Sequence, residues 1–329
     1  MHKEEPKVKR GEKINLGPEI IAVVGPTACG KTRRAVSIAK TIGGEIISGD
    51  SRQVYKGMDI GTGKDLCEYG GVRHHLIDIV EAGEKYNLHR FLTDFHDSKI
   101  EIEERGKMPV LCGGTGMYVE AALSGLVMPK VERNEKLRAS LDGKSLEELT
   151  AILKTYKSLH NTTDVDTRDR ALRAIEIQQY YTDHPEEAVA ADRSTAKPLN
   201  SLVIGIDIPR DARREKISRR LDARIEEGMI DEIKGLLARG IKAEDLIYYG
   251  LEYKFVTLHA IGELSLDDMR RQLEIAIHQF AKRQMTWFRG MEKRGIPIRW
   301  LPYNIPENEF IDIVKTWIEE FPGGAKENN

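Results

Sequence analysis

A glycine-rich octapeptide near the amino end constrains the fold more than any other feature of the sequence. It lies between an apolar run, residues 20–24, and a segment of helical pattern, residues 33–42. It reads Gly25, Pro26, Thr27, Ala28, Cys29, Gly30, Lys31 and Thr32. This matches G-x-x-x-x-G-K-[ST], in which backbone amides and a helix N-terminus hold phosphate, the lysine reaches the outer phosphates and the hydroxyl meets Mg²⁺. The sequence therefore predicts a di- or triphosphate site, with Thr32 as the candidate metal ligand.

Three further apolar runs predict strands, at residues 45–48, 108–112 and 201–207. Short apolar strands separated by helical segments indicate a parallel sheet with helices on both faces, and ligands then bind at the carboxyl ends of the strands. We therefore expect an α/β fold of the P-loop type, a parallel sheet flanked by helices.

The rest of the chain is helical in pattern. Strand patterns are missing between about residues 130 and 197, while residues 214–239 and 267–291 read as helices. The expected organisation is a flexible tail at 1–18, a catalytic core at 19–130 plus 198–310, a helical insertion at 131–197, and a C-terminal helix and tail at 311–329.

Composition excludes several classes of protein. The chain has 329 residues, 40% of them apolar and 32% charged, and no uncharged run approaches the ~20 residues of a membrane span. Its three cysteines fit neither a disulfide framework nor metal spacing. A net charge of −2 argues against a uniformly basic polyanion binder, although Lys and Arg cluster near residues 168–173, 210–220 and 282–289. We expect a cytoplasmic monomer that does not enter membranes.

Polar residues follow two of the other expected strands. Asp50 comes directly after residues 45–48, where a carboxylate is a candidate general base, metal ligand or turn cap, and Gln53 suits the edge of a nucleobase. Thr115 lies within the Gly-Gly-Thr-Gly segment after residues 108–112, either to donate to an oxygen that gains charge or as part of a tight turn. We interpret His74 and His75 as structural rather than metal-binding.

The residues alone leave two classes open, a P-loop transferase and a P-loop NTPase of the ATP-binding or kinase type. Asp78 and Asp207 both end apolar runs and are candidate Walker B carboxylates, but neither lies in a compelling pattern.

Seven motifs taken together resemble the tRNA dimethylallyltransferase family, also called tRNA isopentenyltransferases, over about residues 20–303. They are GPTACGKT at 25–32, DSRQVYKGMDIGTGK at 50–64, HHLIDI at 74–79, GGTGMY at 113–118, RDRALRAIEI at 168–177, RRLDARIEEGMIDEI at 219–233 and AKRQMTWFRG at 281–290. The resemblance implies that the loop binds the diphosphate of dimethylallyl diphosphate rather than ATP. The prenyl group is then transferred to N6 of the adenosine 3′-adjacent to the anticodon.

The resemblance also implies roles for individual residues. Lys31 and Arg220 hold the diphosphate, Thr32 assists with Mg²⁺, Thr115 hydrogen-bonds near the bridging oxygen, and Asp50 accepts the proton from N6. The insertion clasps the anticodon stem-loop, and Gln284 supports the face formed by Lys282 and Arg283. The implied tRNA-binding residues are Asp50, Ser51, Arg52, Gln53, Arg138, Asp169, Arg170, Ala171, Leu172, Arg173, Lys282 and Arg283.

The sequence departs from the family pattern at four points. Cys29 replaces a serine, Glu252 and Phe255 change an I-G-Y-K-E segment, and His278 replaces an arginine. We expect the last three to face tRNA and to leave the diphosphate site alone. The rival hypotheses are an adenylate isopentenyltransferase that modifies free AMP, ADP or ATP, and a nucleotide-hydrolysing or kinase-type P-loop protein.

Overall fold

The computed structural model describes residues 17–159, 163–190 and 196–322. The chain divides into two compact units, the first formed by Met1–Leu123 with Leu199–Asn329 and the second by Ser124–Pro198. The expected insertion, residues 131–197, falls within the second unit. Of the expected tails, residues 1–16 and 323–329 lie outside the described residues.

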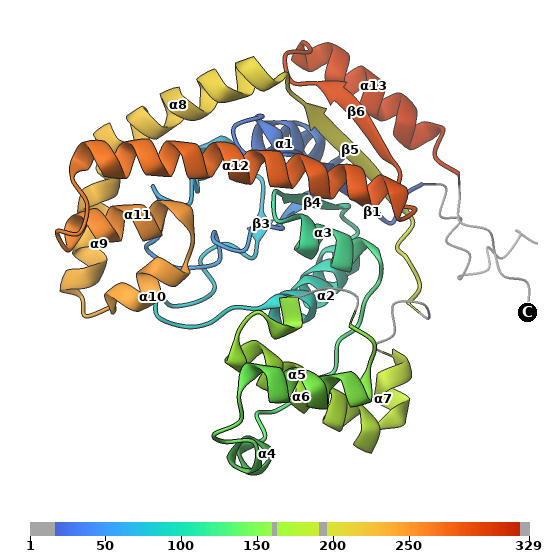
Figure 1. The fold of residues 1–329 in the computed structure, drawn as a ribbon. Helices are drawn as coiled ribbons and strands as arrows, with labels where there is room; N and C mark the ends of the chain where they lie inside the picture. Colours follow the sequence, from blue (N-terminus) through green and yellow to red (C-terminus); the bar gives the residue numbers. More distant parts are fainter. Residues whose placement is uncertain (1–16, 160–162, 191–195, 323–329) are drawn as a thin grey trace, which may run out of the picture. The chain divides into compact units, whose positions relative to one another are not determined.

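A six-stranded, wholly parallel sheet forms the centre of the first unit (Figure 1). The strands are β1 Ile20–Val24, β2 Glu45–Ser48, β3 His74–His75, β4 Pro109–Gly113, β5 Ser201–Asp207 and β6 Ile298–Pro302, in the spatial order β3-β2-β4-β1-β5-β6. Every residue of β1, β2 and β4 is buried, as their apolar sequences predict. Since the strands are parallel, the segments that follow β1, β2 and β4 leave the sheet at one edge.

This sheet confirms the predicted α/β fold. Two strands were not predicted from the sequence. β3 has two residues, too few for a periodic signal, and β6 is an edge strand whose Arg299 and Trp300 are partly exposed. Trp300 packs on its neighbour β5, where a Cβ on Gly205 would lie 2.3 Å from the indole ring.

Helices cover the sheet in the first unit. They are α1 Lys31–Ile42, α2 Leu88–Glu104, α3 Gly116–Leu123, α8 Arg210–Glu226, α9 Met229–Ala238, α10 Ala243–Tyr248, α11 Leu251–Ala260, α12 Leu266–Lys293 and α13 Glu307–Glu319, with a 3-10 turn at Leu66–Tyr69. The single helix expected at residues 214–239 is interrupted at Gly228, whose φ of 102° is unfavourable for other residues. α13 packs on α1, where Ser37 Oγ donates to Glu307 Oε1 at 2.6 Å.

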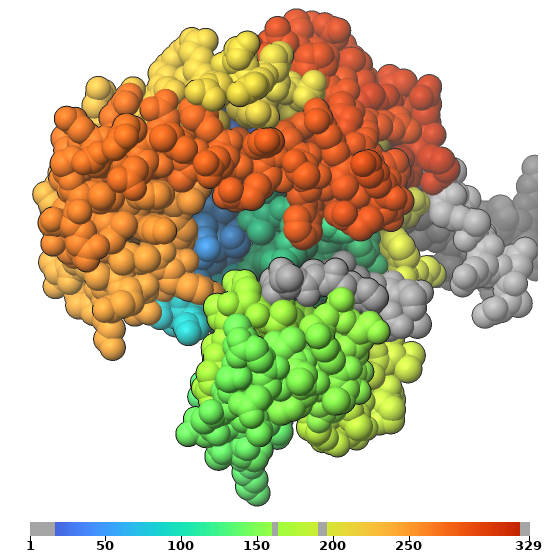
Figure 2. All heavy atoms as spheres, viewed as in Figure 1, coloured from blue at the N-terminus to red at the C-terminus, as the bar shows by residue number. Residues whose placement is uncertain are grey.

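The long helix α12 crosses the first unit and contacts α3, α8 and α11 (Figure 1). Its buried stripe includes Leu273, Ile277, Gln284 and Phe288, and its other face forms an exposed band, orange in Figure 2. α12 meets α3 closely, because a Cβ on Gly116 would lie 2.3 Å from Trp287 Cδ1.

The second unit is helical, with its own apolar core. Its elements are α4 Glu135–Ser140, α5 Leu146–Tyr156, the 3-10 turn Thr163–Val165, α6 Arg168–Asp183 and α7 Pro185–Ala190. Leu149 and Leu153 of α5 pack against Leu172 and Ile175 of α6. Among the described residues of the whole chain, none of the helices is long and apolar enough to cross a membrane.

Candidate active site

The octapeptide between β1 and α1 forms a compact loop that only certain residues fit. A Cβ on Gly25 would lie 2.7 Å from Cys29 Sγ and 3.2 Å from the Ile206 carbonyl oxygen of β5. Gly30 adopts a left-handed φ of 86° and precedes α1, which has no side-chain cap at this end. The uncapped N–H groups of the first helical turn are therefore available to an anion, as the sequence motif predicts.

Gln284 of α12 ties this loop to the glycine-rich segment after β4. Its Oε1 accepts from the Thr27 N–H at 2.8 Å, and its Nε2 donates to the Gly114 carbonyl at 2.8 Å. Gln284 is buried. The expectation that Gln284 supports an RNA-facing surface beside Lys282 and Arg283 is therefore wrong. Gln284 instead fixes the spacing of the two loops. It also accepts the hydrogen bond of the Thr27 N–H, one of the backbone amides of the phosphate-binding motif.

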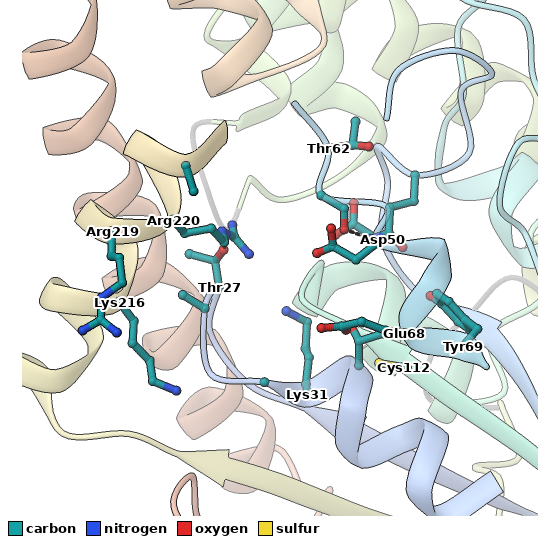
Figure 3. A pocket seen from close by; sticks show the side chains of 18 residues that line it. Thr27, Lys31, Asp50, Thr62, Glu68, Tyr69, Cys112, Lys216, Arg219 and Arg220 are labelled. Atoms are coloured by element: carbon teal, nitrogen blue, oxygen red, sulfur yellow. Dashed lines mark hydrogen bonds between the residues drawn. The ribbon is translucent and has the colours of Figure 1, made fainter. Parts of the chain in front are cut away.

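A cavity of about 400 Å³, here called the anion cavity, opens beside the loop (Figure 3). Its cationic lining comes from α1 and α8, namely Lys31, Lys216, Arg219 and Arg220. Arg220 Nη2 donates to Thr27 Oγ1 at 2.6 Å, which brings α8 against the loop as the resemblance requires. Lys216 was not predicted, although its i to i+4 spacing from Arg220 places both on one helix face.

Three acidic residues, Asp50, Asp65 and Glu68, also line the anion cavity. Both carboxylate oxygens of Asp65 accept from Arg224 Nη2, at 2.5 and 2.6 Å. Burial, and then the nearby Asp65 charge, raises the pKa of Glu68. These effects reduce the negative charge that the wall presents to an anion, so the cavity remains suited to phosphate.

The two buried cysteines of this region are not nucleophiles. Burial raises the pKa of Cys112 to about 12 and also raises the pKa of Cys29, so both are neutral thiols near pH 7.

Thr32, the candidate metal ligand, lines the anion cavity. Its position fits a Mg²⁺ ion bound by one hydroxyl and the oxygens of a substrate phosphate. Within the described residues, no group of three or more His, Cys, Asp or Glu side chains is placed to hold a metal.

Asp50 and Thr115 lie on adjacent loops at the carboxyl ends of β2 and β4. Thr115 Oγ1 accepts from the Ser51 N–H at 3.1 Å and donates to Ser51 Oγ at 3.3 Å. Asp50 Oδ1 accepts from the Arg52 N–H at 2.9 Å. Asp50 therefore caps a turn and also lines the anion cavity, where its role as a general base stays a prediction.

A second cavity, of about 480 Å³, joins the anion cavity and is here called the aromatic cavity. Its apolar walls are formed by Met117, Tyr249, Leu251, Tyr253, Phe280 and Trp287. Its polar lining includes Ser51, Arg52, Thr115, Glu252 and Arg283. Five residues line both cavities, namely Thr27, Lys31, Asp50, Thr62 and Arg220. An anionic group and an apolar or aromatic group can therefore meet beside Asp50.

The loop after β2 is held by its own contacts. Gln53 Oε1 accepts from Ser48 Oγ at 3.0 Å, and Gln53 Nε2 donates to the Gly63 carbonyl at 3.2 Å. Because both ends of this amide are engaged, we reassign Gln53 from nucleobase contact to loop support. Glu232 of α9 accepts from the N–H groups of Ile60, at 2.7 Å, and Gly61, at 3.2 Å.

The histidine and Asp78 segment is structural. His75 Nε2 lies 2.8 Å from Glu45 Oε2, and Arg105 binds the same carboxylate. Asp78 pairs with the buried ammonium of Lys64. A Walker B role for Asp78 therefore does not fit this arrangement.

The implied tRNA contacts in the second unit have mixed environments. Ala171 and Leu172 are buried in the core of the unit, so direct contact of these side chains with RNA is not supported. Arg138 is mostly buried and binds Glu176 at 2.7 Å and Asp169 at 2.9 Å. Arg173 donates to the Val131 carbonyl at 2.8 Å. Arg138 and Arg173 thus hold the unit together.

The remaining implied tRNA contacts are more accessible. Arg170 is exposed and pairs with Asp166. In the first unit, Lys282 and Arg283 are exposed on α12, and Arg283 also lines the aromatic cavity.

Two of the departures from the family pattern lie elsewhere than expected. Glu252 lines the aromatic cavity and, with Arg220, a small adjoining cavity, so it is near the diphosphate residues. His278 is mostly buried, and its Nε2 lies 3.6 Å from Glu274 of α12. Burial lowers the pKa of His278, and the Arg214 charge of α8 lowers it further. His278 therefore belongs to the packing of α12 beside α8 rather than to an RNA-facing surface.

The fold and the two joined cavities define a P-loop protein with a site suited to group transfer. Comparison with known proteins identifies the family. The IPP transferase model matches residues 53–291, and the isopentenyl transferase model matches residues 18–75. The chain belongs to the IPP transferase family, whose similar members include tRNA dimethylallyltransferases.

Two curated relatives show how much of the chain is shared. The chain is 57% identical to tRNA dimethylallyltransferase 1 of Parabacteroides distasonis, over 89% of this chain and 95% of the relative. It is 56% identical to tRNA dimethylallyltransferase 1 of Porphyromonas gingivalis, over 90% of this chain and 97% of the relative.

Solved structures share the fold. The full-length tRNA isopentenylpyrophosphate transferase of Bacillus halodurans is 32% identical, with a TM-score of 0.67, over 92% of this chain and 97% of that one. A eukaryotic dimethylallyltransferase acting on tRNA is 23% identical, with a TM-score of 0.75, over 93% of this chain and 81% of that one. The latter supports the fold alone.

Proposed function

We propose that this protein transfers the dimethylallyl group of dimethylallyl diphosphate to N6 of the adenosine 3′-adjacent to the anticodon in tRNA. The family supports the reaction. The observation that carries the proposal is that Lys31, Asp50 and Arg220 line both cavities. A diphosphate in the anion cavity and a base in the aromatic cavity would therefore meet at the proposed general base.

The donor's diphosphate would bind the anion cavity. Breaking the carbon–oxygen bond increases the negative charge on the leaving diphosphate, so cations placed there stabilise the transition state more than the ground state. Lys31, Arg220, Lys216 and Arg219 supply those cations. The Thr115 hydroxyl would hydrogen-bond near the bridging oxygen.

A magnesium ion at Thr32 would neutralise diphosphate charge when bound. The position of Thr32 in the anion cavity supports this role, and the ligand's own oxygens would supply most of the coordination.

The acceptor base would enter the aromatic cavity after leaving its stack in the anticodon loop. Enzymes that act on a base commonly extrude it and hold it against aromatic side chains by its Watson–Crick edge. Asp50 would take the proton that N6 loses, because a positioned base raises the reactivity of a weak amine nucleophile. Lys282 and Arg283 would contact the RNA backbone. We propose that the protein acts as a monomer in the cytoplasm.

Transfer of labelled prenyl group tests this proposal. The full chain receives labelled dimethylallyl diphosphate and magnesium, with unmodified tRNA, AMP, ADP or ATP as the acceptor. The expected result is label in tRNA alone. Label in the free nucleotides would identify an adenylate isopentenyltransferase, and ATP turnover without prenyl transfer would identify a nucleotide-hydrolysing or kinase-type protein.

A further inference from the structure

Glu252 is a carboxyl group in the aromatic cavity that the proposed reaction does not use. It lies in the first turn of α11, directly after the turn that contains Gly250. Gly250 has a φ of 123°, and a Cβ there would lie 3.3 Å from Arg52 Nε. This turn therefore packs on the loop that carries Asp50, and Glu252 and Asp50 line the same cavity.

The Glu252 carboxyl lacks the fixed partners of neighbouring carboxylates. Glu232 accepts from three backbone N–H groups of the loop, and Asp65 binds Arg224. No side chain among the described residues hydrogen-bonds or ion-pairs with Glu252. The other charged and titratable groups that line its two cavities are Lys31, Asp50, Arg52, Arg220, Arg224, Tyr249, Tyr253 and Arg283. The side chain is thus left available to a ligand.

Two carboxyl groups in one cavity do not both ionise readily, because each charge disfavours the other. Burial raises the pKa of Glu252 more than its own N–H group and Arg220 lower it, and the Asp50 charge raises it further. The raised pKa favours the carboxylic acid form of Glu252, which can donate a hydrogen bond, while the Asp50 carboxyl group offers an acceptor oxygen.

The Watson–Crick edge of adenine offers the complementary pattern. N6–H donates and the adjacent N1 accepts, whereas guanine presents an acceptor at O6 and a donor at N1. We propose that Glu252 donates a hydrogen bond to N1 of the acceptor adenine while Asp50 accepts from N6–H. The two carboxyl groups then read the base together. This inference rests on the proposed function and adds a specificity-determining residue to it.

The test compares adenosine with 1-deazaadenosine, which has a C–H group in place of N1, at the position 3′ of the anticodon in an anticodon stem-loop RNA. Prenyl transfer to each RNA is measured with the wild type, Glu252→Gln and Glu252→Ala, using the full chain. Glu263→Ala, an exposed glutamate of the α11–α12 turn, is the matched control. The KM for dimethylallyl diphosphate and the circular dichroism spectrum of each variant report on folding and donor binding.

The wild type and Glu263→Ala should prefer adenosine by about tenfold in kcat/KM, which corresponds to about 1.4 kcal/mol for the one hydrogen bond that 1-deazaadenosine cannot accept. Glu252→Gln keeps a donor and should keep the preference, whereas Glu252→Ala should lose it. The wild-type kcat/KM should also fall as pH rises through the Glu252 pKa, and Glu252→Gln should lack that fall.

A wild type that modifies both RNAs equally would overturn the inference while leaving the proposed function intact. The same conclusion follows if Glu252→Ala keeps the preference, or if it changes only the donor KM. A wild type that modifies neither RNA would instead overturn the proposed function.

Discussion

Arg220 of α8 donates to the Thr27 hydroxyl at 2.6 Å, which joins a helix from the last third of the chain to the phosphate-binding loop. This contact aims the guanidinium at the anion cavity and fixes Thr27 on its wall. Because Arg220 lines the aromatic cavity as well, it marks the boundary between the two proposed substrates.

Replacing Arg220 by alanine should raise the KM for dimethylallyl diphosphate by about 10- to 100-fold, because a hydrogen bond to a charged group contributes about 1.5–3 kcal/mol. Steady-state kinetics with varied donor concentration measure this effect. Arg271→Ala, which removes an exposed arginine paired with Asp268, is the control. A change confined to the affinity for tRNA would reassign Arg220 to RNA binding.

Replacing Asp50 by alanine should lower turnover by about 100-fold or more while largely retaining tRNA binding, as expected for loss of a positioned base. Single-turnover prenyl transfer and filter binding of tRNA separate these effects. Asp50→Asn keeps an acceptor oxygen for the Arg52 N–H and so controls for loss of the turn contact. Unchanged turnover in Asp50→Ala would remove Asp50 from the mechanism.

Replacing Gln284 by leucine should lower the free energy of unfolding by about 1–3 kcal/mol, since it leaves the buried Gly114 carbonyl and the partly buried Thr27 N–H without their partner. The kcat/KM for the donor should fall with it, because the spacing of the two loops is lost. Urea unfolding and steady-state kinetics provide the two measurements. Gln279→Leu is the control, because Gln279 is an exposed glutamine of α12 that does not join the two loops. Equal effects of the two variants would refute the role given to Gln284.

Glu176 should make the second unit sensitive to acid. Burial alone would raise the pKa of this carboxyl. Hydrogen bonds from Arg138, the Asn134 N–H and Arg173 together lower the pKa by more than burial raises it, so the folded pKa lies below its ordinary value. Its stabilising contribution is therefore present above the unfolded pKa of about 4.3 and is lost as pH falls through the folded pKa.

Urea unfolding between pH 7 and pH 3 should show that this loss is smaller in Glu176→Gln than in the wild type. Glu186→Gln, at an exposed position of α7, should follow the wild type. Parallel curves for Glu176→Gln and the wild type would contradict the assignment.

Local patterns predicted the parts of the site that follow directly from strands. The phosphate-binding loop, Asp50 and Thr115 each follow an apolar run, so a parallel sheet necessarily brings them to one edge. The bounds of β1, β2 and β5 were predicted for the same reason, since buried strands leave continuous apolar sequence.

Contacts made between distant segments had no comparable local signal. Gln284 lies among basic residues of an amphipathic helix, and only the packing of α12 shows that it turns inward to Thr27 and Gly114. Glu252 enters the cavity because the turn at Gly250 packs on Arg52. Arg138 looks like a solvated cation in the sequence but binds the buried Glu176. Such pairings depend on tertiary packing, which periodicity does not encode.

Nucleoside analysis of a modified RNA tests the central claim most directly. An anticodon stem-loop with adenosine 3′ of the anticodon, and a matched one with guanosine there, are incubated with the protein, dimethylallyl diphosphate and magnesium. Both are then digested to nucleosides and analysed by mass spectrometry. The account predicts N6-dimethylallyladenosine from the first RNA and no prenylated nucleoside from the second. A first RNA recovered without a prenylated nucleoside, or prenylation in both RNAs, would contradict it.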